Sequence, residues 1–112
     1  MKIPARRKYR NTKCQYNGMT FDSIKERDRY ITLELMQKAG LIRNLLTQQV
    51  FVLAESVVLD GREKPALRYV ADFTYFDANE FVVEDVKGVK TKEYRIKRHL
   101  MKSVLGIEVK EI

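Results

Sequence analysis

Residues 69–88 read YVADFTYFDANEFVVEDVKG, and this stretch decides the fold of the chain. Two runs rich in β-branched and aromatic residues flank a polar turn at 77–80, which is typical of a β-hairpin. Each run carries an acidic residue where acids are unexpected, Asp72 in the first and Asp85 in the second. A carboxylate among apolar neighbours costs free energy unless it is paired or binds a cation. The pattern therefore indicates two acids that serve one site.

Strand periodicity places Asp85 and Lys87 on one face of the second strand and Glu84 on the other. If the two strands are neighbours in a hairpin, Asp72 lies beside Asp85 and their charges repel. A divalent cation removes this conflict, and hard oxygen ligands favour Mg²⁺ or Mn²⁺. We expect Glu84 to form a structural ion pair. In a simpler alternative, Asp72 and Asp85 pair with Lys87 or Arg95 and bind no metal.

Helix and turn signals precede this stretch. The turn Asn17-Gly18 favours a short hairpin over residues 13–21. A helix over residues 23–39 begins with Ser23-Ile24-Lys25-Glu26, which matches the capping box S-x-x-E. We expect this helix to bury an apolar stripe formed by Ile24, Ile31 and Leu35 and widened by Leu33 and Met36.

Strand-like runs cover residues 45–59, 67–76 and 81–87, with polar turns at 60–65 and 77–80. The short links between these strands imply an antiparallel meander. A second helix is expected from the N-cap Thr91 to Leu105, before Gly106, and a last strand covers 107–112.

The predicted fold is a single α/β domain over residues 13–112. Its core has the order helix, three strands, helix, strand, with a mixed sheet flanked by helices and a short N-terminal hairpin before it. Residues 1–12 are expected to form a basic arm, either extended or disordered.

Positive charge is concentrated in two segments. The 112 residues hold 22 Lys and Arg against 15 Asp and Glu, for a net charge of +7. Residues 1–13 hold six basic residues and no acid, and residues 87–102 hold seven basic residues and one acid. Such segments suit a polyanion, because each Lys or Arg placed on a phosphate releases counterions. A solvated surface is the plainer alternative.

Composition excludes several classes of protein. No apolar run approaches the roughly 20 residues of a membrane helix, and the basic N-terminus lacks the apolar stretch of a signal peptide. One cysteine and one histidine exclude an internal disulfide and a zinc site built from several Cys or His. We therefore expect a cytoplasmic protein with no membrane partner.

Asp72 followed by Asp85-Val86-Lys87 resembles the D…(D/E)-x-K signature of the PD-(D/E)XK, or restriction-endonuclease-like, superfamily of nucleases. The predicted order of elements is also that of the superfamily core. The stretches 17–26, 69–73 and 83–88 are similar to a family of small phage and prophage proteins grouped with Holliday-junction-resolvase-like nucleases. Two positions depart from the motif of the superfamily: residue 71 is Ala instead of Pro, and residue 85 is Asp where Glu is commoner.

This resemblance implies a role for each motif residue. Asp72 and Asp85 would bind Mg²⁺, or Mn²⁺ in its place, helped by the backbone carbonyl of Val86. Lys87 would be the catalytic lysine, and Glu26 would be a further catalytic acid near the metal. Alternatively, Glu26 serves only as the capping glutamate of its helix.

The resemblance also implies a substrate and partners. We expect an endonuclease that hydrolyses phosphodiester bonds in double-stranded or branched DNA, such as a Holliday junction, during phage or prophage DNA metabolism in a bacterial host cell. A homodimer is expected, because one active site cuts one strand and two strands must be cut. The residues expected to contact DNA are Arg6, Arg7, Lys8, Lys90, Lys92, Arg95, Lys97 and Arg98.

Two alternatives to a DNA nuclease stay open. A protein with this fold and these basic segments could bind nucleic acid without cleaving it, and a nuclease could act on RNA. All three predict binding that weakens with salt, whereas only the nucleases predict metal-dependent cleavage. Gln48 lies near a position where the superfamily sometimes has a polar residue, but we do not include it in the predicted site.

Overall fold

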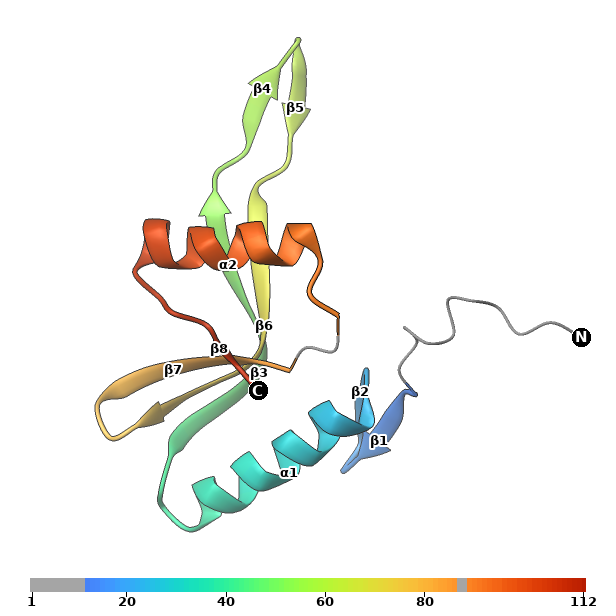
Figure 1. Cartoon of the computed structure of the whole chain (residues 1–112), viewed down its shortest axis with the longest axis vertical. Coiled ribbons are helices and arrows are strands. Elements are labelled where there is room, and N and C mark those ends of the chain that lie inside the picture. The colour runs from blue at the N-terminus through green and yellow to red at the C-terminus, as the bar shows by residue number, and fades with distance from the viewer. Residues whose placement is uncertain (1–11, 87–88) are drawn as a thin grey trace, which may run out of the picture.

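The computed structural model describes residues 12–86 and 89–112 (Figure 1). An N-terminal hairpin, formed by β1 (Cys14–Tyr16) and β2 (Met19–Phe21), is confirmed. Its turn residues Asn17 and Gly18 have φ angles of 54° and 79°, as a two-residue hairpin turn requires. The predicted basic arm falls almost wholly on residues 1–11, outside the described ranges.

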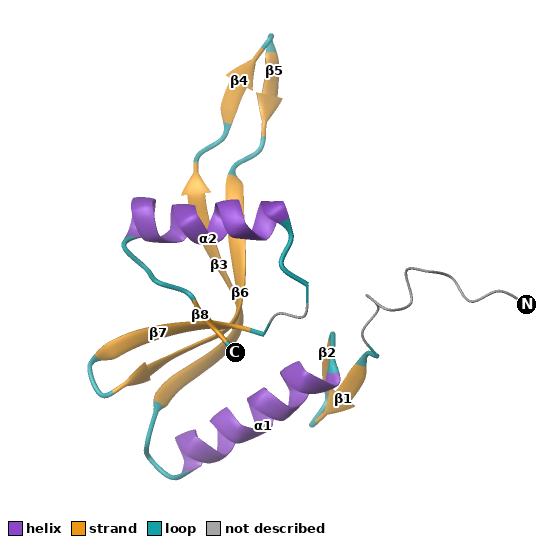
Figure 2. Ribbon diagram, viewed as in Figure 1, coloured by secondary structure: helices purple, strands orange, loops and turns teal. Residues whose placement is uncertain are grey.

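A four-stranded sheet with the strand order β3-β6-β7-β8 forms the centre of the molecule. The strands β3 (Arg43–Ala54), β6 (Leu67–Asp77) and β7 (Glu80–Asp85) pair antiparallel, as predicted for a meander. β8 (Lys110–Glu111) runs parallel to β7 and makes the sheet mixed. The α/β class is thus confirmed, with two helices and a mixed sheet in residues 12–86 and 89–112 (Figure 2).

Three predicted strand and turn boundaries are wrong. The run 45–59 is broken after β3, because the chain leaves the central sheet and β4 (Val57–Leu59) pairs instead with β5 (Arg62–Lys64). The turn expected at 60–65 shrinks to Asp60 and Gly61, which both have positive φ. The strand expected over 107–112 has only the two residues of β8, because these alone pair with the last residues of β7.

Residues 55–66, which contain β4 and β5, form a unit that we call the projecting hairpin. Figure 1 shows that it extends β3 and β6 beyond the helices and away from the body of the molecule. In the described part of the chain, β4 and β5 pair only with each other.

Both helices begin at the caps that the sequence predicts. In α1 (Ile24–Lys38), the hydroxyl of Ser23 accepts a hydrogen bond from the backbone N–H of Glu26 at 3.0 Å. In α2 (Lys92–Leu105), the hydroxyl of Thr91 accepts from the N–H of Tyr94 at 3.0 Å. These bonds satisfy N–H groups that have no partner within the helix. No helix in the described residues has the length and apolar character needed to cross a membrane.

The predicted stripe of α1 is confirmed at Leu33 and Met36 and is wrong at Ile24 and Leu35. Leu33 is fully buried, whereas Ile24 and Leu35 are 49% and 60% exposed. Glu26 and Arg29 precede Leu33 on the inward side, where Glu26 is buried and Arg29 bonds to the sheet. Because two polar residues hold inward positions, the buried side of the helix is shifted away from Ile24 and Leu35 and keeps Leu33 and Met36 of the predicted stripe.

Each helix has its own hydrophobic cluster. The cluster of α1 consists of Phe21, Leu33, Ile42, Phe73, Tyr75 and Val82. The cluster of α2 consists of Leu53, Tyr69, Ala71, Val83, Tyr94, Met101 and Val109. Along β6 the change from one cluster to the other falls between Ala71 and Phe73, so Asp72 lies where the two clusters meet.

Substitution of Leu33 by Ala should lower the free energy of unfolding by about 2–5 kcal/mol, because it leaves a cavity under α1. Leu35→Ala, two residues away on the exposed side, should change it by no more than about 0.5 kcal/mol. Urea denaturation followed by circular dichroism measures both. An equal loss in the two variants would contradict the assigned buried face.

Candidate functional site

The two motif aspartates lie next to each other at one end of the β6–β7 pair. Phe73 pairs with Glu84, so the next step of the antiparallel register brings Asp72 opposite Asp85. The carboxylate of Asp72 accepts a hydrogen bond from the backbone N–H of Val86 at 2.8 Å. Asp85 is fully buried, and Asp72 is half-buried. The hairpin thus brings the two predicted metal ligands together.

Glu26 extends this acidic centre from the first turn of α1. Its Oε1 atom accepts a hydrogen bond from the backbone N–H of Asp22 at 3.3 Å, and its side chain is buried. Burial raises the pKa of Glu26 to about 7, and the negative charges of Asp72, Asp22 and Asp85 act in the same direction. One carboxylate therefore assists in capping the helix and also faces the two motif aspartates.

Gln48, which is not among the predicted site residues, lies between Glu26 and Asp72. Its Nε2 atom is 3.4 Å from Oε2 of Glu26 and 3.5 Å from Oδ1 of Asp72. Gln48 also has a φ of 54°, in the left-handed region that residues other than glycine seldom adopt. The sequence signal for it was an amide side chain in a run of apolar and β-branched residues.

The donor atoms suit a hard cation, although they do not form a ready-made cage. In the described residues, no group of three or more His, Cys, Asp or Glu side chains is arranged to hold a metal. The acids form an adjacent pair, Asp72 and Asp85, with Glu26 on the other side of the Gln48 amide. Oxygen donors are the ligands of Mg²⁺ and Mn²⁺, and a cation would offset the repulsion that raises the pKa of Glu26. The donor chemistry therefore fits Mg²⁺.

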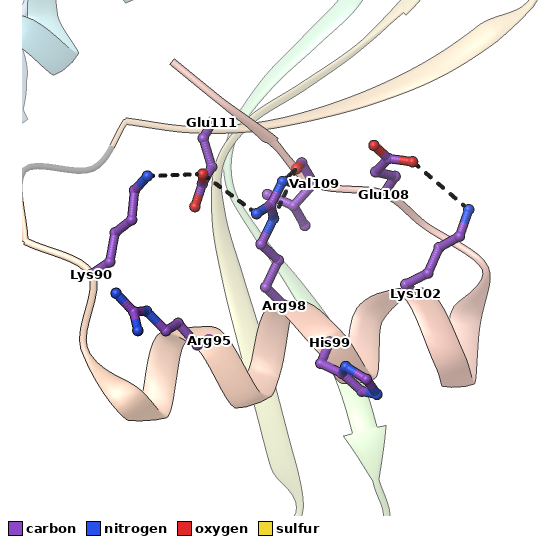
Figure 3. Close-up of a pocket in the computed structure, with 8 residues that line it drawn as sticks. All are labelled: Lys90, Arg95, Arg98, His99, Lys102, Glu108, Val109 and Glu111. Atoms are coloured by element: carbon purple, nitrogen blue, oxygen red, sulfur yellow. Dashed lines mark hydrogen bonds and ion pairs between the residues drawn. The ribbon is translucent and has the colours of Figure 1, made fainter.

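The remaining predicted site residues divide into two groups. Lys87, Arg6, Arg7 and Lys8 lie outside the described residues. The others lie on α2 or directly before it, and three of them, Lys90, Arg95 and Arg98, line a pocket of about 560 Å³ (Figure 3). Lys92 and Lys97 do not line it, and Lys97 forms an ion pair with Glu93 at 3.6 Å.

The basic pocket adjoins the acidic centre through β8. Glu111, at one side of the pocket, pairs in register with Asp85. It forms ion pairs with Lys90 at 3.1 Å and with Arg98 at 3.4 Å, which hold these two cations in place. Arg95 is the pocket's third cation near this end, and Figure 3 shows its side chain reaching toward the loop before α2. The pocket thus supplies positive charge close to the paired aspartates.

Glu84 belongs to a structural network and not to the acidic centre, as predicted. It is 1% exposed and accepts two hydrogen bonds from Arg29, at 2.9 and 2.7 Å. The hydroxyl of Tyr75 donates a further short hydrogen bond to it. Two donors with one positive charge compensate for the burial of this carboxylate.

Comparison with known proteins places the chain in a family. A family model described as "Protein of unknown function (DUF1064)" matches residues 6–110. The chain belongs to the DUF1064 family. It has no significant match among curated proteins or among solved structures.

Arg29→Ala should destabilise this DUF1064 protein by about 3–5 kcal/mol, because it leaves the buried Glu84 carboxylate without a counter-charge. Arg27→Ala is the matched control on the same helix, since Arg27 pairs with Asp28 at the surface and should contribute less than about 1 kcal/mol. Urea denaturation at neutral pH measures both losses. Similar losses in the two variants would contradict the structural role of the Arg29–Glu84 pair.

The pKa of Glu26 predicts a specific dependence of stability on pH. Glu26 in the unfolded chain titrates near 4.5, and in the folded chain near 7. Between these values the folded state retains a proton that the unfolded state has lost, so rising pH removes stability, by about 3 kcal/mol in full. Glu26→Gln removes this dependence. Relative to the wild type, the variant should gain about 2–3 kcal/mol on going from pH 5 to pH 8.

Urea denaturation at the two pH values, without divalent cations, tests this prediction. Glu55→Gln, at an exposed position, should follow the wild type at both. A constant difference between Glu26→Gln and the wild type would contradict the raised pKa.

Proposed function

We propose that this protein is a Mg²⁺-dependent endonuclease that hydrolyses phosphodiester bonds in DNA, with a restriction-endonuclease-like core. The observation that carries the proposal is the meeting of Asp72, Asp85 and Glu26 beside a basic surface. Three carboxylates repel a phosphate, whereas the neighbouring Lys and Arg residues attract it. This combination favours a nucleic-acid substrate if a cation neutralises the acids. Mn²⁺ is the alternative ion.

In this proposal, Asp72 and Asp85 hold the cation, with help from the carbonyl of Val86 and from Glu26. The bound ion would supply Lewis-acid polarisation of the phosphate and would lower the pKa of a coordinated water. Lys87, whose role rests on the motif resemblance, would position the attacking water and offset the negative charge that develops on the phosphate. Without the cation the pKa of Glu26 is about 7, and a bound cation would lower this pKa and favour the carboxylate that serves as a ligand.

The basic residues would hold the substrate. Lys90, Arg95 and Arg98 in the pocket, with Lys92 and Lys97 on the same helix, can contact backbone phosphates and orient the strand to be cut. Branched DNA such as a Holliday junction is the leading substrate by resemblance, which also favours a role in phage or prophage DNA metabolism. Cleavage of two strands would require two copies of the site, and hence a homodimer.

A second candidate function is non-catalytic binding of nucleic acid. The ion pairs of Lys90 and Arg98 with Glu111 support it, because they arrange positive charge in the pocket without any metal. Binding to phosphates would not need the paired aspartates. Cleavage assays therefore separate the two functions.

Asp85→Asn should abolish cleavage while preserving the fold and the salt-sensitive binding of DNA. Loss of an outer-shell partner of a metal typically costs about 10–100-fold in activity, so loss of a ligand should cost at least about 100-fold. The assay uses linear, nicked and four-way DNA, together with RNA, in Mg²⁺, Mn²⁺ or EDTA. Wild-type protein is expected to cut DNA in either metal and to be inactive in EDTA.

Asp77→Asn is the matched control, because Asp77 is an exposed aspartate at the far end of β6. It should cut DNA as the wild type does. If the wild type binds DNA but cuts no substrate in either metal, the non-catalytic function replaces the nuclease. If Asp85→Asn cuts as well as the wild type, the assigned site is wrong, and preferential cleavage of RNA would change the substrate class.

A further inference from the structure

The projecting hairpin exposes an apolar strand. Val57, Val58 and Leu59 of β4 are 51%, 68% and 55% exposed. Successive side chains of a strand point to opposite faces, so three exposed residues in a row mean that neither face of β4 is covered. A two-stranded hairpin without a covering layer is only marginally stable in water. The projecting hairpin therefore has both the surface and the energetic reason to be covered by a partner.

The outer edge of β4 is also open. In the described part of the chain, β4 has β5 as its only strand partner, in the register Val57–Lys64, Val58–Glu63 and Leu59–Arg62. The other edge of β4 presents backbone N–H and C=O groups that can pair with a further strand. An apolar strand with an open edge is the usual requirement for pairing between chains.

The distribution of charge favours a second copy of this chain as the partner at this edge. The chain carries a net charge of +7, and its two basic segments, residues 1–13 and 87–102, repel those of a second copy. The projecting hairpin lies outside both segments in the sequence, and its Glu55, Asp60 and Glu63 outnumber Arg62 and Lys64 and give it a net charge of −1. Two copies can therefore meet there with little electrostatic repulsion. Nucleic acid is a poor occupant of the same surface, which is apolar and slightly acidic.

We propose that β4 pairs antiparallel with β4 of a second copy, about a twofold axis at Val58. In this register Val58 lies opposite Val58 of the second copy, and Val57 lies opposite Leu59, so every apolar side chain meets another one. Pairing through β5 about Glu63 would instead set Glu63 against Glu63 and Arg62 against Lys64. Both contacts join like charges, which is unfavourable. The side-chain pairs therefore favour contact through the edge of β4 and not through the edge of β5.

Light scattering after size exclusion tests the interface in the full chain. Wild-type protein should have twice the 13.2 kDa mass of one chain. Val58→Lys should have the mass of one chain, because it places two positive charges at the axis. Leu35→Lys is the control, since it makes the same kind of change at a residue of similar exposure on α1, and it should stay dimeric.

Disulfide cross-linking tests the register, in a Cys14→Ser background that removes the one native cysteine. Val58→Cys should cross-link under mild oxidation, because Cα atoms of directly opposed residues are about 4.5–5.5 Å apart, within reach of a disulfide. Val57→Cys should not, because residue 57 faces residue 59 of the second copy. Circular dichroism checks that each variant is folded.

Four results would overturn the proposal: a single-chain mass for the wild type, an assembly that grows beyond two chains, a dimer that persists in Val58→Lys, or equal cross-linking of the two cysteine variants. The interface does not rest on nuclease activity, and the assays keep the two apart. A monomer that cleaves DNA would contradict the homodimer and its interface but not the nuclease activity. A dimer with the predicted register that cleaves no substrate would contradict the proposed nuclease activity but not the interface.

Discussion

The hydrogen bond from the backbone N–H of Val86 to the carboxylate of Asp72 is the contact on which the acidic centre depends. β7 ends at Asp85, so the regular ladder between β6 and β7 stops where the site begins. At that point the side chain of Asp72 on β6 accepts a hydrogen bond from the next backbone N–H, that of Val86. The bond fixes Asp72 beside Asp85 at the end of β7.

The two buried glutamates Glu84 and Glu26 differ in how far the fold compensates their negative charge. Glu84 is compensated by Arg29 and Tyr75, so its charge is stabilised within the fold. Glu26 is surrounded by further acids and by the amide of Gln48, and its pKa rises to about 7. A structural acid receives its counter-charge from the protein. An acid that keeps a raised pKa retains a demand for a proton or a cation, and that demand is what favours a functional role for Glu26.

The exposure of Ile24 and Leu35, two residues of the predicted stripe of α1, has the same physical origin. Apolar periodicity locates the inward side of a helix only if the inward residues are apolar. In α1 the inward positions before Leu33 hold Glu26 and Arg29, one in the acidic centre and the other bonded to Glu84. The apolar residues Ile24 and Leu35 consequently lie on the outside. A helix whose pattern disagrees with its packing is thus one that contributes polar residues to the interior.

Local features of this protein were determined by the sequence alone. Ser23 and Thr91 cap their helices because a hydroxyl can accept from a nearby N–H whatever the surroundings, and Asn17-Gly18 turns because both residues tolerate positive φ. The adjacency of Asp72 and Asp85 also followed, since a short polar link makes successive strands neighbours. These outcomes depend on a few residues close together in the chain.

Tertiary structure decided what depends on distant residues. Whether Glu26 only caps its helix or also faces the aspartates was settled by the packing of α1 against β3 and β6, which brings it to Gln48 and Asp72. The break between β3 and β4 was likewise invisible in an unbroken apolar run, because it depends on where the pairing with β6 ends. Residues 22 or more positions apart in the chain meet in this centre, and no local pattern encodes such a meeting.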